Sequence, residues 1–332
     1  MNLAAQGTLL LTRRDVAALL SLDDAIAAVE QAFRLHAEGH TLPPGVLSVP
    51  AADGGFHLKA AGLKLARSYF AAKCNANFPL NPQRHELPTI QGVVLLADAE
   101  NGRLLAVLDS MEITALRTAA ATAVAAKFLA RPGSRRVFLC GCGQQGRYHL
   151  RALAQVFPLE QASVFDTDAG KAQRLASEFS AELKIEICAV GDLAAMRQSD
   201  IVVTCTPSRQ AFLGPADIAP GTFLAAVGAD SPEKQELDPR LLAESTVVVD
   251  SLEQCAAFGE LHHALAAGLL RRDDIHAELA EVVAGRKPGR GTPEEIIVFD
   301  STGTALEDVS AAAAAYEAAV RQRRGHWINF AA

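Results

Sequence analysis

The stretch Arg136-Val-Phe-Leu-Cys-Gly-Cys-Gly-Gln-Gln-Gly146 decides the fold of this chain. An apolar run typical of a buried strand leads directly into the pattern G-x-G-x-x-G, and the residues from Gln144 to Phe157 follow a helical pattern. The next apolar run ends in Asp166, at about the 20-residue offset after the glycines that is typical of dinucleotide-binding units. The stretch therefore predicts a strand, a glycine-rich turn and a helix that together bind a dinucleotide.

Each glycine of this pattern has a separate physical role. Gly141 permits the tight turn, Gly143 lets the backbone approach a pyrophosphate, and Gly146 allows the helix and the strand to pack closely. The free amides and the dipole of the helix N-terminus then receive the phosphates. Asp166 would accept hydrogen bonds from both ribose hydroxyls and repel a 2′-phosphate, so NAD(H) is predicted rather than NADP(H). The alternative is a glycine turn in an α/β unit that binds no cofactor.

Strands and helices continue to alternate from Arg135 toward the C-terminus. The apolar residues of the candidate strands are continuous, which is typical of strands buried on both faces of a parallel sheet. This part of the chain is therefore predicted to form a doubly wound parallel sheet. The candidate strands are residues 136–140, 162–166, 184–188, 200–205, 222–227, 246–250 and 296–299.

The chain before this sheet has a different texture. Residues 56–110 contain short extended runs separated by prolines, and Asn101-Gly102 between two apolar runs is a strong hairpin signal. An antiparallel sheet is therefore predicted there. Helices are predicted at residues 13–39, 116–130 and 308–321, and the last of these is expected to pack back on the first domain. Asp15 and Ser21 are the N-cap candidates of the first helical region.

The composition of the 332 residues limits the possible partners. Lys and Arg number 31 against 38 Asp and Glu, and a net charge of −7 gives no electrostatic reason to bind nucleic acid or an anionic membrane. No apolar run reaches the length of about 18 residues that a membrane span needs. The six cysteines form no C-x-x-C pair, and the N-terminus lacks the pattern of a signal peptide. A cytoplasmic protein without a metal site is therefore expected.

Three charged residues are candidates for the chemistry. Asp230 follows the strand 222–227, where it could move a proton at a nitrogen or a water, or could be an N-cap or turn residue. Lys73 is a lone cation in an apolar strand, where it could bind a carboxylate or polarise a C=O or C=N group, or could be an exposed edge lysine. Arg117, at the head of the 116–130 helix, could pair with a carboxylate or phosphate or form a structural salt bridge. His262-His263 is not expected to bind a metal, because adjacent helical residues point in different directions.

Motifs along nearly the whole chain resemble the ornithine cyclodeaminase/mu-crystallin family. In order they are Leu87-Pro-Thr-Ile90, Leu108-Asp-Ser110, Thr114-Ala-Leu-Arg-Thr-Ala-Ala-Ala-Thr-Ala123, Gly141-Cys-Gly-Gln-Gln-Gly146, Val227-Gly-Ala-Asp-Ser-Pro-Glu-Lys-Gln-Glu-Leu237, Val249-Asp-Ser-Leu-Glu-Gln254 and Phe299-Asp-Ser-Thr-Gly303. The resemblance implies a homodimer of an α/β protein. Its NAD-binding Rossmann domain would be residues 117–306. An α+β substrate-binding and dimerisation domain with a mixed, largely antiparallel sheet would be residues 1–116 and 307–332.

The resemblance also implies roles for single residues. Lys73 would be a catalytic residue that also binds the substrate, and Asp230 would be the catalytic acid/base. Arg117 and Thr302 would also contact the substrate. The positions implied for the cofactor are Thr89, Arg117, Gly141, Gly143, Gln144, Gln145, Gly146, Asp166, Thr206, Val227, Lys234 and Ser301.

Two departures separate the chain from the ornithine cyclodeaminases. Those enzymes carry an arginine where this chain reads Leu42-Pro-Pro-Gly-Val-Leu47, and a glutamate where it has His57. Lys59 is expected to supply the missing cation for substrate binding.

The predicted function is an NAD(H)-dependent oxidoreductase that interconverts a small 2-imino acid, or a 2-oxo acid plus an amine, with an L-amino acid. The alternatives are an ornithine- or lysine-type cyclodeaminase that releases ammonia and a mu-crystallin-like NAD(P)H-dependent binding protein.

Overall fold

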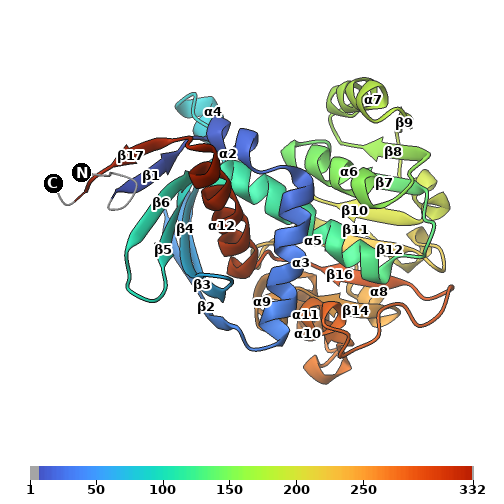
Figure 1. Ribbon diagram of the computed structural model, residues 1–332. Helices are drawn as coiled ribbons and strands as arrows, with labels where there is room; N and C mark the ends of the chain where they lie inside the picture. The colour runs from blue at the N-terminus through green and yellow to red at the C-terminus, as the bar shows by residue number, and fades with distance from the viewer. Residues whose placement is uncertain (1–6, 331–332) are drawn as a thin grey trace. The chain divides into compact units, whose positions relative to one another are not determined.

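The computed structural model describes residues 7–330, and its contacts divide the chain into two compact units. The first unit comprises Met1–Thr118 and Thr304–Ala332, and the second unit comprises Ala119–Gly303. Each unit is built on a sheet of its own, as Figure 1 shows. The predicted fold class, a parallel sheet combined with a mixed and largely antiparallel sheet, is confirmed.

The first unit contains a seven-stranded sheet in the order β17-β1-β6-β5-β4-β3-β2. Neighbouring strands from β6 to β2 are antiparallel, whereas β1 is parallel to β6 and antiparallel to β17. The predicted hairpin is present, because Asn101-Gly102 joins β5 to β6. The strands are β1 (Thr8–Leu11), β2 (Thr41–Ala51), β3 (Gly54–Lys64), β4 (Ser68–Asn77), β5 (Ile90–Asp98), β6 (Leu104–Asp109) and β17 (His326–Ile328).

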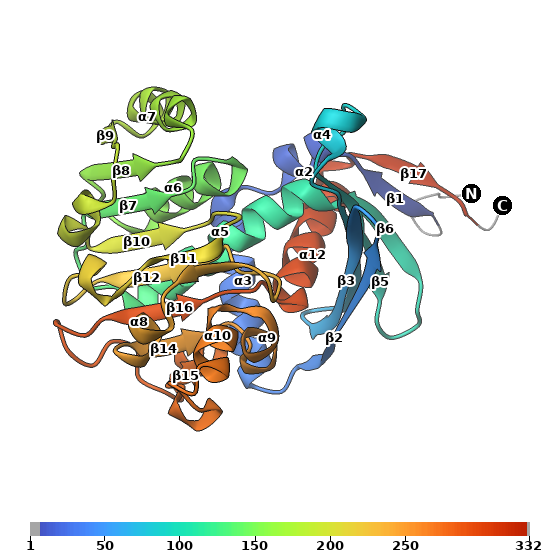
Figure 2. The ribbon, with the colours of Figure 1, turned by 180° about the vertical axis from the view of Figure 1, so that it is seen from behind.

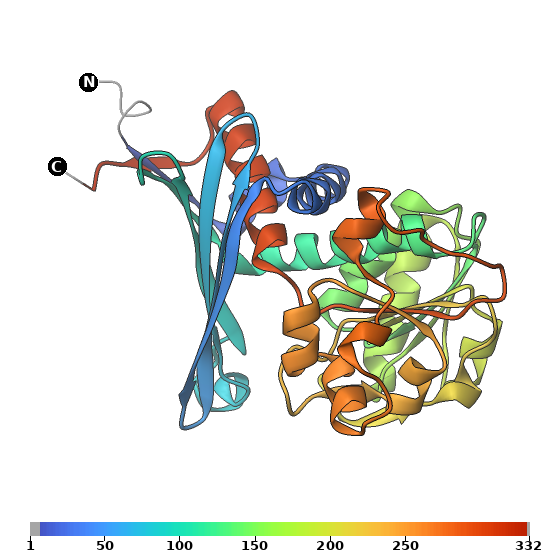
Figure 3. The same cartoon turned by 90° about the horizontal axis from the view of Figure 1, so that it is seen from below.

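Helix α12 (Ala305–Gln322) runs along one face of this sheet, as Figure 3 shows with the sheet seen nearly edge-on. Strand β4 turns Tyr69, Ala71 and Lys73 toward that face, where the Tyr69 ring contacts Tyr316 of α12. The helix therefore packs back on the first unit, as predicted. The other helices of the unit are α2 (Arg13–Leu19), α3 (Leu22–Ala37), α4 (Asn81–Arg84) and the first part of α5 (Ser110–Leu129).

The opposite face of the same sheet is apolar and exposed. Alternate residues of β4 and β5 point there, and Phe70, Val93 and Leu95 are 36%, 41% and 41% exposed. Leu47 of β2 and Phe56 of β3 extend this surface, at 57% and 41% exposure. We call these five side chains the outer apolar face.

The second unit contains an eight-stranded sheet in the order β15-β14-β16-β12-β10-β7-β8-β9, in which every neighbouring pair is parallel. All seven strands predicted for this part are present. Helix α6 (Gln144–Val156) lies on one face (Figure 1), and α8 (Pro239–Ala243), α9 (Leu252–Phe258) and α10 (Glu260–Ala266) lie on the other (Figure 2). The strands are β7 (Arg136–Cys140), β8 (Gln161–Phe165), β9 (Glu186–Ala189), β10 (Ile201–Thr204), β12 (Phe223–Ala226), β14 (Thr246–Val249), β15 (Ala277–Glu278) and β16 (Ile297–Asp300).

Three expectations about helix ends and strands were wrong. Helix α5 begins at Ser110, because the Asp109 carboxylate accepts the Glu112 amide at 2.9 Å and caps it, so Arg117 lies inside the helix and not at its head. Thr12, not Asp15, is the N-cap of α2, and Asp15 completes a capping box from inside the helix. Strand β2 was missed because its prolines argue against a strand, but an edge strand tolerates them.

Candidate active site

Lys73 lies in the middle of β4 and is only 4% exposed, so the exposed edge lysine considered from the sequence is wrong. Its ammonium contacts both carboxylate oxygens of Asp308 on α12, at 2.8 and 2.7 Å. Lys59 of β3 is its register partner and lies on the same face of the sheet, half-buried. The fold therefore holds a lysine in a buried position, where only a carboxylate partner makes its charge tolerable.

Arg117 joins the same cluster from α5. Its Nε donates to Asp308 at 3.0 Å, and its Nη1 donates to Glu307 at 2.8 Å; all three side chains are buried. The salt bridge considered from the sequence is thus present. The domain division predicted from the sequence began the Rossmann domain at residue 117, whereas contacts assign Arg117 to the first unit. We call Lys59, Lys73, Arg117, Glu307 and Asp308 the cation cluster.

The charges in this cluster change each other's protonation. Burial, with the nearby charge of Arg117, lowers the pKa of the Lys73 ammonium to about 7, although the Asp308 carboxylate opposes the shift. Burial alone would raise the pKa of Asp308, but the charges of Lys73 and Arg117 outweigh it and lower that pKa. Lys73 can therefore gain or lose a proton near neutral pH, while Asp308 stays ionised.

Glu307 and Asp308 were not predicted as site residues. The signal was weak: both are acids in the first turn of a helix, which is a common and favourable place for acids on any helix. Only the packing of α12 on the sheet brings Asp308 to Lys73, 235 positions away along the chain.

The glycine-rich turn of the second unit fits the three roles predicted for it. Gly141 has a φ of +105°, and a Cβ at Gly146 would collide with the Gly141 carbonyl oxygen, so both positions require glycine. Within residues 7–330, a Cβ built at exposed Gly143 would meet no atom within 4 Å apart from its own chain neighbours, so the backbone there is open to a ligand. Gln144 and Gln145 then begin α6 and place its N-terminus at this opening.

Asp166 directly follows β8 and is oriented by the turn itself. One of its carboxylate oxygens accepts the Cys142 amide at 2.9 Å, and the other accepts the Asp168 amide at 2.9 Å. These contacts hold the carboxylate beside the glycine-rich turn. In a dinucleotide-binding unit, a carboxylate at this position accepts hydrogen bonds from the ribose hydroxyls.

The remaining cofactor candidates of the second unit follow the strands on the other side of β7. Thr206 follows β10 and Val227 follows β12, and the Val227 amide donates to the Thr204 carbonyl at 2.9 Å. The buried hydroxyls of Ser301 and Thr302, after β16, both donate to the Asp250 carboxylate, at 3.1 and 3.2 Å. The Ser301 and Thr302 side chains are therefore held by hydrogen bonds within the unit.

Asp230 lies in the turn after β12, and its side chain is 53% exposed. Its carboxylate pairs with the Lys234 ammonium at 2.5 Å, so the structure brings two predicted site residues together. The turn leads into β13 (Gln235–Leu237), so the helix N-cap considered from the sequence is wrong. The carboxylate is therefore accessible from solvent, with the Lys234 ammonium as its ion-pair partner.

Thr89 precedes β5 in the first unit and is half-buried. Its carbonyl accepts the Phe78 amide at 2.8 Å.

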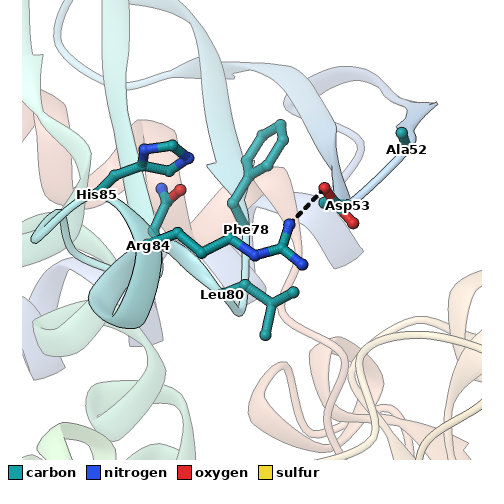
Figure 4. A pocket seen from close by; sticks show the side chains of 7 residues that line it. Ala52, Asp53, Phe78, Leu80, Arg84 and His85 are labelled. Atoms are coloured by element: carbon teal, nitrogen blue, oxygen red, sulfur yellow. Dashed lines mark hydrogen bonds and ion pairs between the residues drawn. The ribbon is translucent and has the colours of Figure 1, made fainter.

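A cavity of about 220 Å³ in the first unit has Phe78, Arg84 and Asp53 in its wall, with Arg84 paired to Asp53 at 2.8 Å (Figure 4). None of the predicted site residues lines it.

The described residues offer neither a metal-binding cluster nor a membrane-spanning helix. Within residues 7–330, no group of three His, Cys, Asp or Glu side chains is arranged to hold a metal ion. The His263 ring contacts the Lys234 carbonyl at 2.8 Å instead. Among the helices of the same described range, none combines the length and the apolar character needed to cross a membrane.

Fold and site together define a two-unit α/β protein of the dinucleotide-binding type, and comparison places it in a family. Residues 6–323 match the ornithine cyclodeaminase/mu-crystallin family, and the chain belongs to that family. It is 38% identical to the alanine dehydrogenase of Archaeoglobus fulgidus, over 97% of this chain and 98% of the relative. It is 34% identical to the iminosuccinate reductase of Paracoccus denitrificans, over 94% and 96%.

Solved structures of relatives have the same fold. An archaeal alanine dehydrogenase dimer with bound NAD superposes with a TM-score of 0.93 at 38% identity, covering 98% of this chain and 99% of that one. The Delta(1)-pyrroline-2-carboxylate reductase of Thermococcus litoralis, in complex with NADH and L-proline, superposes with a TM-score of 0.92 at 34% identity, covering 97% and 100%.

Proposed function

We propose that this protein is an NAD(H)-dependent oxidoreductase that interconverts a small 2-imino acid, or a 2-oxo acid plus an amine, with an L-amino acid. The observation that carries the proposal is the buried Lys73, which shares the Asp308 carboxylate with Arg117, in a chain that also presents an open glycine-rich turn. Relatives of this chain are named for reactions of this class, and two of the similar structures contain NAD or NADH.

The second unit would hold the cofactor. Gly143 and the N-terminus of α6 would receive the pyrophosphate, and Asp166 would bind the ribose hydroxyls and favour NAD(H). When bound, the nicotinamide supplies a hydride acceptor or donor. Thr206, Val227 and Ser301 follow neighbouring strands and would contact the other half of the dinucleotide.

The cation cluster would bind the substrate. The ammonium of Lys73 and the guanidinium of Arg117 would hold the α-carboxylate, with Lys59 adding a third cation beside them. Glu307 and Asp308 keep the two buried cations in place before substrate arrives. Asp230 would give or take the proton at the substrate nitrogen or at an attacking water, and its exposed carboxylate permits that exchange.

One assay tests the proposal. The protein is mixed with NADH and a panel of 2-oxo acids (glyoxylate, pyruvate, oxaloacetate) plus ammonium or a primary amine, and with cyclic ketimines. Net consumption of NADH is expected with at least one member of the panel. Ammonia release from ornithine or lysine without net change in NADH would assign the protein to the cyclodeaminases, and NADH binding without turnover would make it a binding protein.

The same assay tests Asp230. Asp230→Asn is expected to abolish turnover and to leave NADH binding intact, because it removes the proton donor and keeps the shape of the turn. Glu233→Gln, on an exposed residue of the same turn, is the matched control and should retain activity.

We also propose that the protein is a homodimer joined through the outer apolar face. Five large apolar side chains exposed on one sheet face form a patch of the kind that marks a protein interface. The similar archaeal alanine dehydrogenase is a dimer.

A further inference from the structure

Glu236, in the short strand β13, is fully buried, yet sequence patterns gave it no role. It lies where β10 and β12, neighbours in the sheet, end at their carboxyl edge. In an open α/β sheet the two halves of a dinucleotide bind on either side of the point where the strand order reverses. Here that point lies between β7 and β10, because the chain runs β7, β8, β9 and then returns to β10. Asp166 marks the adenosine half, so β10 and β12 belong to the nicotinamide half.

The Glu236 carboxylate joins the ends of these two strands. One oxygen accepts both the amide and the hydroxyl of Thr206, at 2.7 Å each. The other accepts the hydroxyl of Thr204 and the amide of Gly228, at 2.8 Å each. Each oxygen therefore accepts from one backbone N–H and from one hydroxyl. The N–H can only donate, whereas a hydroxyl could also accept.

The fit is close on the side of β12. A Cβ at Gly228 would collide with the Glu236 carboxylate and with the Thr206 carbonyl oxygen. Gly228 begins the turn that carries Asp230, and the Asp230 amide donates back to the Gly228 carbonyl at 3.2 Å. The position of that turn therefore depends on the buried carboxylate.

Glu236 itself is held by another buried acid. The Glu260 carboxylate accepts the amides of Glu236 and Leu237, at 2.7 and 3.1 Å, and so fixes the backbone of β13. Because Glu236 is 0% exposed, it cannot touch a bound substrate or cofactor, and any effect on them passes through Thr206 and Gly228.

We propose that Glu236 is a positioning residue that sets the Thr206 and Val227–Asp230 loops for the nicotinamide half of the cofactor. A carboxylate is essential to this role, because only a carboxylate accepts from all four donors. A glutamine of the same shape would direct an N–H group at the Thr206 or Gly228 amide, which cannot accept it. The inference rests on the proposed function, since it assumes that this protein binds NAD(H).

The test compares two ligands on Glu236→Gln by calorimetry. NADH spans both halves of the site, whereas ADP-ribose carries the adenosine half and the pyrophosphate without the nicotinamide. We expect the Kd for NADH to rise about tenfold, the equivalent of about 1.4 kcal/mol, and the Kd for ADP-ribose to change less than about twofold. An unchanged Kd for NADH, or an equal loss of affinity for both ligands, would overturn the inference.

Two further variants complete the design. Thr204→Val removes one of the four donors and keeps its shape, so it should weaken NADH selectively even where Glu236→Gln does not fold; no selective loss in it would also count against the inference. Glu295→Gln is the matched control, because Glu295 accepts the Thr246 hydroxyl and the Gly291 amide near the amino end of β14, away from the cofactor edge. If the wild-type protein bound neither NADH nor ADP-ribose, that result would contradict the proposed function itself, and the inference about Glu236 with it.

Discussion

Lys73 is buried, at 4% exposure, which is rare for a side chain that can carry a charge. Removing an ammonium from water costs several kcal/mol, and the protein offsets this with the two contacts to Asp308. The same burial lowers the pKa of Lys73 to about 7, so its charge becomes sensitive to small changes near neutrality. A lysine on the protein surface would stay charged throughout this range.

Binding of a substrate carboxylate should therefore depend on pH. The cation is present below about pH 7 and is lost as the pH rises through the lowered pKa, so an anion binds more weakly on the alkaline side. We expect the Kd of pyruvate for the protein–NADH complex to rise from pH 7 to pH 9, by up to about tenfold per pH unit, when followed by NADH fluorescence. Lys73→Met should bind pyruvate weakly and without this dependence. A flat wild-type profile would contradict the assignment.

At the scale of the element, the first turn of α12 serves both the helix and the cation cluster. One oxygen of Glu307 accepts the Thr304 amide at 3.0 Å in a capping box, and the other pairs with Arg117 at 2.8 Å. The helix dipole favours negative charge at this end, so the cap and the ion pair support one another. The start of α12 is therefore a fixed support for Arg117 and Lys73.

Glu307→Gln separates these two contributions. Glutamine can still accept the Thr304 amide, but it leaves Arg117 without one of its buried charge partners. We expect the free energy of unfolding in urea to fall by about 3 kcal/mol, as is typical when one partner of a buried ion pair is removed. Glu30→Gln, which removes an exposed helical pair with Arg34, is the control and should change stability by less than about 0.5 kcal/mol. Equal effects of the two changes would mean that burial adds nothing to the Arg117 pair.

At the scale of the whole molecule, the two faces of the seven-stranded sheet have different surroundings. One face is packed by α12 and carries Lys73, whereas the outer apolar face leaves Leu95 and its neighbours exposed. Large apolar side chains on an open sheet face are stable in water mainly when a partner covers them. A second copy of the chain, contributing the same face, would bury both sheets by two-fold symmetry.

The mass in solution tests this arrangement. The wild-type protein is expected to elute with twice the chain mass of 35.0 kDa when measured by light scattering. Leu95→Lys places a charge in the outer apolar face and should shift the mass toward that of one chain. Leu269→Lys changes a similarly exposed leucine of the second unit and should leave the mass unchanged. A single-chain mass for the wild type would rule out the dimer.

Local sequence determined most of the second unit, including seven of the eight strands of its parallel sheet. The glycines of the 141–146 turn, the strand before it and the helix after it are each specified by neighbours a few positions away, and all were predicted at nearly their observed bounds. The seven continuous apolar runs were likewise identified as strands, since burial on both faces leaves a local signature. Lys73 could be named as a candidate because it is a lone cation in an apolar strand, Arg117 because of its place on a predicted helix, and Asp230 because it follows a predicted strand.

Contacts between distant residues were decided only by the tertiary structure. Asp308 and Glu236 are ordinary acids in the sequence, and each acquires its contacts from strands or helices that meet it after long separations along the chain. Strands β1 and β17 pair from opposite ends of the described chain, which no local pattern indicates. Periodicity and turn chemistry act over a few residues, whereas buried charges are placed by the packing of whole elements. The sequence therefore determined the dinucleotide-binding fold, and the tertiary structure decided which charged side chains meet.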